Sequence, residues 1–166
     1  VNHKYIFKLI FSFLIKMVDV KVKKLNPEAM LPNYAHEGDA GLDFYSCEDT
    51  IIYPNERKLV STGISMEFPK GYVALVWDKS GIASKKGVET MAGVIDCHYR
   101  GEIKILLHNN DKEPYEIKKS QKIAQILIQP VERVNIIEVN ELTSTQRGEG
   151  GFGSTGLTNN SFKPGN

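Results

Sequence analysis

The stretch Gly93-Val94-Ile95-Asp96-Cys97-His98-Tyr99-Arg100-Gly101-Glu102 indicates the fold more clearly than any other part of the chain. An apolar run ends at residue 95, and Ile103, Ile105 and Leu107 follow the polar middle at every second position. Alternation with a period of two is typical of a half-buried strand. We therefore predict a β-hairpin with a polar tip over this region.

Short strands of the same kind are predicted along most of the chain. Val18, Val20 and Val22 alternate with polar residues, as do Ile64, Met66 and Phe68. Further predicted strands, rich in Val, Ile, Tyr and Phe, are 42–46, 50–53, 57–61, 71–77, 91–95, 122–129 and 131–139. A short helix is predicted over 80–86, with Ser80 as its cap. The pattern predicts an all-β fold, a jelly-roll-like antiparallel β-barrel with one short helix.

Composition limits the function classes that fit the chain. The 166 residues suit one globular domain, with 41% hydrophobic and 25% charged residues. A net charge of +1 argues against a protein that binds nucleic acid directly through many phosphate contacts. Cys47 and Cys97 form no C-x-x-C pair, so we expect no zinc site or disulfide framework and a cytoplasmic location, with a nuclear or viral-host compartment as the alternative.

The two ends differ from the body, and we predict three parts: 1–16, 17–142 and 143–166. Residues 1–16 carry an apolar run shorter than the ~20 residues of a membrane-spanning helix. No small-residue cleavage site follows it, so we expect a non-native or disordered extension ahead of Met17; a targeting or membrane-surface peptide is the alternative. We expect no membrane partner.

Residues 147–156, Arg-Gly-Glu-Gly-Gly-Phe-Gly-Ser-Thr-Gly, form a glycine-rich segment. Its G-x-G-x-x-G match lacks the strand before and the helix after it that a dinucleotide site needs. A disordered tail is one interpretation. The fixed aromatic, basic and hydroxyl residues favour a second, a flexible arm that becomes ordered over a ligand, with Phe152 on a flat ring and Arg147, Ser154 and Thr155 on phosphate oxygens.

Several polar residues at strand ends are candidates for chemistry. Asp96 follows an apolar run directly, so we expect it at the rim of the core, where a partly buried carboxylate can deprotonate a water. Lys79 and Ser80 open the predicted helix, where phosphate could bind, although ordinary capping explains Ser80 equally well. Gln125 lies in an apolar strand and is therefore either partnered or functional.

Five segments, in order, resemble the motifs of the trimeric deoxyuridine triphosphatase family. They are Ala40-Gly41-Leu42-Asp43-Phe44-Tyr45-Ser46; Lys79-Ser80-Gly81-Ile82-Ala83; Gly93-Val94-Ile95-Asp96 with Tyr99-Arg100-Gly101-Glu102; Lys122-Ile123-Ala124-Gln125; and Arg147-Gly148 with Gly150-Gly151-Phe152-Gly153-Ser154-Thr155-Gly156. The resemblance runs from Met17 to Gly156.

The resemblance implies that the protein hydrolyses dUTP to dUMP and pyrophosphate with Mg²⁺, which keeps uracil out of DNA and supplies dUMP for thymidylate synthesis. It implies that Asp96 activates the attacking water and that Tyr99 packs under the deoxyribose. It assigns base reading to the backbone of 93–104, phosphate contacts to the second and fourth motifs, and the terminal phosphates and base cover to the arm. The implied substrate-binding residues are Lys79, Ser80, Gly81, Gly93, Val94, Ile95, Tyr99, Lys104, Gln125, Arg147, Phe152, Gly153, Ser154 and Thr155. Asp43 is the implied metal residue, acting through water, and each site is built from three subunits of a homotrimer.

Three departures from the family pattern concern rate and phosphate affinity. Lys79 replaces the usual Arg, His98 replaces a common acid, and 120–122 reads Ser-Gln-Lys where Gly-Asp-Arg is commoner. Two other functions compete with this one: a dCTP deaminase, which shares the fold, and a regulatory dUTP or protein binder without turnover. Asp96 and the complete arm favour phosphate hydrolysis over both.

Overall fold

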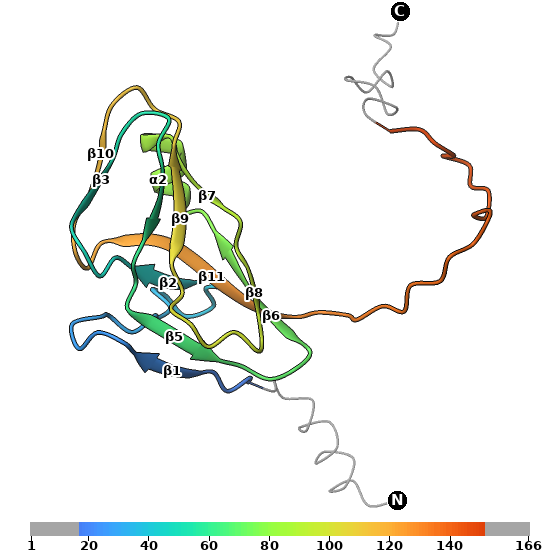
Figure 1. Cartoon of the computed structure of the whole chain (residues 1–166), viewed down its shortest axis with the longest axis horizontal. Coiled ribbons are helices and arrows are strands. Elements are labelled where there is room, and N and C mark those ends of the chain that lie inside the picture. The colour runs from blue at the N-terminus through green and yellow to red at the C-terminus, as the bar shows by residue number, and fades with distance from the viewer. Residues whose placement is uncertain (1–16, 152–166) are drawn as a thin grey trace, which may run out of the picture. The chain divides into compact units, whose positions relative to one another are not determined.

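The computed structural model describes residues 17–151 (Figure 1), and they form short strands with one short helix. The strands are β1 (Lys21–Lys24), β2 (Leu42–Tyr45), β3 (Thr50–Ile52), β4 (Arg57–Val60), β5 (Ile64–Glu67), β6 (Tyr72–Trp77), β7 (Val88–Met91), β8 (Val94–Asp96), β9 (Ile105–Asn109), β10 (Tyr115–Ile117) and β11 (Lys122–Pro130). The helix is α2 (Ser80–Lys86). The prediction of a jelly-roll-like, all-β fold with one short helix is confirmed.

The strands of residues 17–151 pair antiparallel in separate groups. The largest has the order β2-β11-β6-β8, and a second has the order β4-β9-β7. The remaining strands pair as β1-β5 and β10-β3. Within the described residues these ladders do not close into a continuous ring, so the fold has the predicted strand content without a fully hydrogen-bonded barrel.

The core lies between these groups of strands and is filled mainly by aliphatic side chains, together with the aromatic rings of Phe44, Phe68 and Tyr115. Its fully buried members include Phe44, Ile52, Val60, Ile64, Ile105, Leu107, Ile117, Ile123 and Ile126. They come from both of the larger groups, so each strand contributes alternate residues to one interior. Burial of each such side chain contributes about 1.5–3 kcal/mol. This core holds the ends of β6, β8 and β11 in fixed positions.

The predicted hairpin over 93–107 is wrong in its pairing. β8 pairs with β6, whereas β9 pairs with β4 and β7, so 97–104 crosses from one group of strands to another. The predicted strand 91–95 is interrupted at Ala92 and Gly93, which both have positive φ. Local alternation could not reveal this, because it identifies a strand and not its neighbour.

Two other predictions differ from the structure. The predicted strand 131–139 is wrong, since β11 ends at Pro130 and no strand follows it in residues 131–151. The cap of α2 is Lys79 with extended backbone angles and no side-chain cap, while Ser80 is the first helical residue. The helix ends at Gly87, whose left-handed φ of 60° lets its N–H reach the carbonyl of Ala83.

The chain divides into two compact units, with the second beginning at Val134. The described part of this second unit, 134–151, carries exposed apolar side chains. They are Val134, Ile136, Ile137, Val139 and Leu142. In the part of the chain that the structure describes, no helix is long and apolar enough to cross a membrane.

Candidate active site

A row of side chains crosses three strands of the largest group because of their register. Gln125 on β11 is paired with Asp43 on β2 and with Trp77 on β6. The register of β11 shifts between Lys122 and Ala124, which inserts one extra residue. Because such a bulge reverses the alternation of faces, Lys122 lies on the same face as Gln125. The bulge therefore brings the charge of Lys122 to Asp43.

These residues line a hollow of about 640 Å³, here called the charged hollow. Its lining residues are Asp39, Ala40, Gly41, Asp43, Trp77, Asp78, Lys79, Ser80, Ala83, Gln125 and Leu127. Four predicted site residues, Asp43, Lys79, Ser80 and Gln125, are thus brought together, from three of the five motifs. Gly81 is exposed on α2 and does not line the hollow.

Asp43 is the electrostatic centre of the charged hollow. It is buried, its Oδ1 accepts a hydrogen bond from Lys79, and its Oδ2 lies 2.6 Å from the ammonium nitrogen of Lys122. That contact is off the direction of a hydrogen bond, and Oδ2 has no hydrogen-bond partner among the described residues. Burial opposes ionisation, but the Lys122 and Lys79 ammonium groups outweigh it and lower the pKa of Asp43. Asp43 is therefore an anion held between two cations.

The Gln125 side chain has a hydrogen-bond partner, which was one of the two interpretations of an amide in an apolar strand. Its amide donates to the carbonyl of Asp78 at 2.8 Å, and the Asp78 carboxylate in turn accepts from the Thr90 hydroxyl at 2.8 Å. A Cβ atom at Gly41 would collide with the Gln125 side chain, 3.0 Å from Cδ. The first motif thus needs glycine because the amide passes directly over it.

A second hollow of about 660 Å³, here called the apolar hollow, lies beside β8 and the 97–104 crossing. Its lining residues are Leu59, Val76, Met91, Ala92, Gly93, Val94, Ile95, Asp96, Tyr99, Glu102, Ile103, Lys104 and Leu106. Of the residues predicted to contact the nucleoside, 93–96, Tyr99 and Lys104 line it. Within the predicted base-reading segment, Cys97, His98 and Arg100 line a different hollow, so only part of the segment faces this space.

The bend at Ala92 and Gly93 shapes one wall of the apolar hollow. Gly93 has a φ of 112°, and a Cβ atom there would lie 3.0 Å from the Val76 Cβ. Its carbonyl accepts the Val76 N–H at 2.9 Å, which fixes the bend against β6. Only glycine combines this φ with this close approach. The bend turns β8 away from β7 and exposes Val94 to the hollow.

Tyr99 is held by the backbone that follows it. Its hydroxyl donates to the carbonyl of Glu102 at 2.9 Å, and its ring lies over Gly101, where a Cβ atom would lie 2.6 Å from Tyr99 Cζ. The Glu102 carboxylate accepts from Ser61 and from the Gly63 N–H at 2.8 Å. Partial burial opposes ionisation of Glu102, but these donors and Lys104 lower its pKa.

Asp96 does not have the partial burial that the sequence predicted. It ends β8, an edge strand of the described sheet, and its side chain is exposed within the single chain. Its carbonyl accepts the Tyr99 N–H at 3.0 Å, which closes the turn that follows. The alternation of apolar residues correctly predicted the end of the strand, but not that its outer side would be open.

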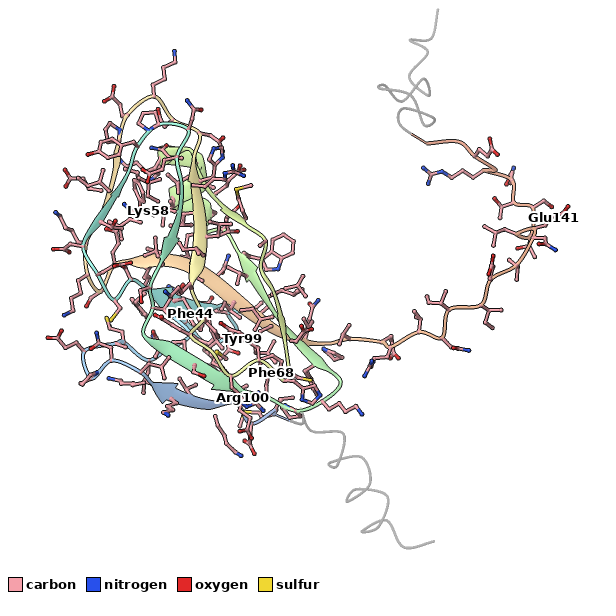
Figure 2. The ribbon with its side chains drawn as sticks, in the orientation of Figure 1. Phe44, Lys58, Phe68, Tyr99, Arg100 and Glu141 are labelled. Atoms are coloured by element: carbon pink, nitrogen blue, oxygen red, sulfur yellow. The ribbon has the colours of Figure 1, made fainter. Side chains whose placement is uncertain are left out.

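The two hollows share no lining residue, although Val76 of β6 lines the apolar hollow and its neighbour Trp77 lines the charged one. Asp96 is paired with Val73 near the start of β6, and the charged hollow begins at Trp77 at its end. Four residues of extended chain separate these positions by about 13 Å. In Figure 2, Tyr99 and Arg100 lie in the half of the folded unit that holds β1 and β5, whereas α2 lies in the other half.

The described part of the fifth motif, 147–151, belongs to the second compact unit. Arg147 is exposed, and its Nε donates to the carbonyl of Gly150 at 2.8 Å. Phe152, Gly153, Ser154 and Thr155 lie outside the described residues. Residues 17–151 contain no group of three or more acidic, His or Cys side chains that could hold a metal ion.

The sequence did not single out Lys122, Gly41 or Glu102 as site residues in their own right. Lys122 stands at the start of an apolar strand, where a charge is usually solvated, and only the bulge turns it toward Asp43. The importance of Gly41 and Glu102 depends on the Gln125 side chain and on the 61–63 loop, which are distant in sequence. Acidic residues often lie next to glycine-containing turns, so this arrangement in the sequence could not predict these contacts.

Comparison with known proteins gives a consistent result. The dUTPase family model matches residues 27–156. The deoxyuridine 5'-triphosphate nucleotidohydrolase of Clostridioides difficile is 49% identical over 143 residues, which is 85% of this chain and 100% of that protein. The enzyme of the same name from Clostridium kluyveri is 52% identical over 141 residues, 84% of this chain and 99% of that protein.

Solved structures of similar fold include phage enzymes. A mutant dUTPase of Staphylococcus bacteriophage 80alpha, solved with dUpNHpp, superposes with a TM-score of 0.79 at 29% identity, over 84% of this chain and 99% of that one. A mutant dUTPase of phage phi11 of S. aureus, described with a structural Mg(II) ion, gives a TM-score of 0.71 at 28% identity, over 76% and 99%. The family match covers both hollows and the arm, and the chain therefore belongs to the dUTPase family.

Proposed function

We propose that this protein is a dUTP diphosphatase, which hydrolyses dUTP to dUMP and pyrophosphate. The observation that carries the proposal is the grouping of family-motif residues into two complementary hollows. One is mostly apolar and suits a base and sugar, and the other presents the Lys79 ammonium, the Ser80 hydroxyl and the Gln125 amide, which suit phosphate oxygens. Such an enzyme limits uracil incorporation into DNA and supplies dUMP for thymidylate synthesis.

Asp96 is the group that we assign to the chemical step. As a carboxylate, it accepts a proton from a water aligned on the α-phosphorus. The new oxygen–phosphorus bond forms as the bond from the α-phosphorus to the bridging oxygen breaks, and pyrophosphate leaves. Phosphoryl transfer of this kind depends mainly on positioning and charge neutralisation. Lys79, Ser80 and Gln125 would hold the phosphates, and Arg147, Gly153, Ser154 and Thr155 would close on them.

Asp43 fits the implied Mg²⁺ through one feature of its surroundings. Its ionised carboxylate lines the charged hollow, so it can accept a hydrogen bond from a metal-bound water once Lys122 moves away from Oδ2. The two lysines lower the net negative charge there, which favours a metal that is carried mainly by the triphosphate. Mg²⁺ would supply charge neutralisation on the phosphates. Asp43 would keep the Lys79 and Lys122 side chains oriented toward the same phosphate oxygens.

Selection of uracil would come from the backbone of 93–104. Peptide N–H and C=O groups can match the donor and acceptor pattern of uracil, whereas cytosine reverses that pattern and leaves polar groups unpaired at about 1–3 kcal/mol each. Tyr99 would exclude the ribose 2′-OH, and Phe152 would cover the base.

The decisive assay measures pyrophosphate release from dUTP, dCTP, dTTP and UTP, with and without Mg²⁺. We expect Mg²⁺-dependent release from dUTP and poor use of the other three. Formation of a uracil nucleotide from dCTP would favour the deaminase instead. Tight dUTP binding without any turnover would favour a regulatory binder.

We further propose that the active unit is a homotrimer, with each site built from several chains. Two features support a composite site: along β6, the position paired with Asp96 lies about 13 Å from Trp77 of the charged hollow, and the segment that follows β11 carries exposed apolar side chains, including Ile136, Ile137 and Leu142. The number three rests on the resemblance to trimeric family members. In this proposal the domain spans 17–142 and the arm 143–166, and the enzyme works in the cytoplasm with both cysteines as free thiols.

Mixing two inactive proteins tests the composite site. One carries Asp96→Asn with its arm intact, and the other keeps Asp96 but ends at Ser144. After joint unfolding and refolding, each mixed trimer has one complete site in about three if Asp96 and the arm come from different chains. Activity should then return on mixing. If each chain closes its arm over its own Asp96, the mixture stays inactive.

A further inference from the structure

Residues 100–103 are joined to 61–65 by a row of hydrogen bonds. The Ser65 hydroxyl donates to the Arg100 carbonyl at 2.7 Å, and the Ile103 N–H donates to the Ile64 carbonyl at 2.8 Å. The Thr62 hydroxyl adds a third bond, to the Ile103 carbonyl, at 2.5 Å. Segments about 40 residues apart in sequence therefore share one seam at the edge of the apolar hollow.

Glu102 adds a charged acceptor to this seam. Its Oε1 accepts from the Ser61 hydroxyl and from the Gly63 N–H at 2.8 Å, and its Oε2 lies 3.7 Å from the Lys104 ammonium. The side chain is 21% exposed, so these contacts are only partly screened by water. Hydrogen bonds to an ionised acceptor are about twice as strong as neutral ones. The carboxylate thus fixes the backbone at 102 more firmly than the neutral bonds on either side.

That backbone holds the Tyr99 ring. The Tyr99 hydroxyl donates to the Glu102 carbonyl at 2.9 Å, and the ring lies against Gly101 with no room for a Cβ atom. A displacement of Glu102 therefore moves both surfaces that hold the ring. Tyr99 is 47% exposed and lines the apolar hollow, so these two contacts are the ones that the described residues show fixing its hydroxyl and its ring face.

We infer that Glu102 is a positioning residue for sugar selection: by binding Ser61 and Gly63 through its carboxylate, it keeps the Tyr99 ring where a ribonucleotide's 2′-OH would have to fit. The inference rests on the proposed dUTP hydrolysis and names the residue that makes the ring rigid. A ring excludes one extra oxygen only if it cannot swing aside, because a loose contact discriminates weakly. Glu102 itself makes no contact with the reacting atoms in this assignment.

The test compares kcat/KM for dUTP and for UTP in the wild type, Glu102→Gln and Ser61→Ala. In Glu102→Gln the dUTP-to-UTP ratio should fall about tenfold, because a charge-assisted link is lost, and Ser61→Ala should lower it by a smaller factor. The fall in the ratio should come from a rise in kcat/KM for UTP relative to kcat/KM for dUTP. Glu116→Gln is the matched control and should keep the wild-type ratio. It removes an exposed carboxylate on β10 that lies 3.4 Å from the Lys118 ammonium.

A second measurement separates positioning from general destabilisation. If Glu102 acts through the ring, Tyr99→Phe combined with Glu102→Gln should lower the ratio no further than the larger single effect. Equal loss of dUTP and UTP turnover, or a lower Tm with an unchanged ratio, would overturn the inference. If Glu102→Gln does not fold, the ratio in Ser61→Ala decides. A wild type that does not hydrolyse dUTP defeats the proposed function and this inference together, whereas a selective wild type with an unchanged Glu102→Gln ratio defeats the inference alone.

Discussion

The charged and apolar hollows lie on the same four-stranded group but are built in different ways. In the charged hollow, strand register and one bulge bring Asp43, Gln125 and Lys122 together, and a buried charge holds them. In the apolar hollow, backbone bends and glycines set the shape, and Asp96 stands exposed at its rim. The reactive carboxylate of the proposed mechanism, Asp96, is therefore not the most buried carboxylate of the site, which is Asp43.

Asp96→Asn gives the largest expected effect and tests the apolar hollow. The amide keeps the shape of the side chain but cannot take the proton of the attacking water, so kcat should fall by about 10²–10⁴-fold. Affinity for a non-hydrolysed dUTP analogue should stay close to that of the wild type, because the exposed Asp96 carboxylate accepts no hydrogen bond from another described side chain that the amide would break. Rapid-quench turnover and calorimetric binding check the two parts. A variant that keeps more than a tenth of the rate would make Asp96 structural.

Asp43→Asn tests the charged hollow and should act on stability first. It removes the buried anion that both ammonium groups contact, but Lys79 and Lys122 are 27% and 42% exposed and can be solvated, so the free energy of unfolding should fall by about 1–2 kcal/mol. Urea unfolding followed by circular dichroism measures this loss. Asp49→Asn is the control, because the Asp49 carboxylate accepts one exposed backbone N–H. Equal stabilities of the two variants would show that the Asp43 cluster has no special role.

Tyr99→Ala should change selectivity more than stability. Removing the ring opens the space that a 2′-OH needs, so the ratio of kcat/KM for dUTP over UTP should fall by about tenfold or more, within the range that binding-site contacts provide. Steady-state assays with both nucleotides measure the ratio. If the ratio is unchanged, sugar selection lies elsewhere and the apolar hollow binds the base alone.

Glu102 should make the stability of the region around the apolar hollow depend on pH. Its pKa is lowered from 4.5 in the folded chain, so its contribution is complete above pH 4.5 and is lost as the pH falls through the lower folded-state value. The free energy of unfolding of Glu102→Gln should therefore lie about 1 kcal/mol below the wild type at pH 7, and the gap should close on acidification. A gap that is constant from pH 7 to pH 3 would contradict this assignment.

Deletion of residues 1–16 should have the smallest effect, because the C. difficile relative matches 85% of this chain over its own full length. Within the described residues, both hollows are lined from Asp39 onward. Activity and Tm of a protein starting at Met17 should equal those of the full chain. A substantial loss of either would assign the extension a place in the folded enzyme.

The sequence alone was enough to predict the all-β class, most strand positions, the short helix and the motif residues of both hollows. Period-two alternation and glycine-rich turns are local signals, so they can be recognised without knowing which strands pair. The order of the motifs can also be read directly along the chain. The strand predicted over 131–139 shows the limit of that reasoning. Its residues alternate well enough for a strand, but a strand needs a neighbouring edge, and residues 131–151 have none in this structure.

The tertiary structure decided which residues meet. The partner of β8 is β6 and not β9, the bulge turns Lys122 toward Asp43, and the 61–63 loop reaches Glu102. Each of these contacts depends on long-range pairing that no window of neighbouring residues records. The sequence thus determined the chemistry available to the protein, and packing of distant strands determined how that chemistry is divided between two hollows.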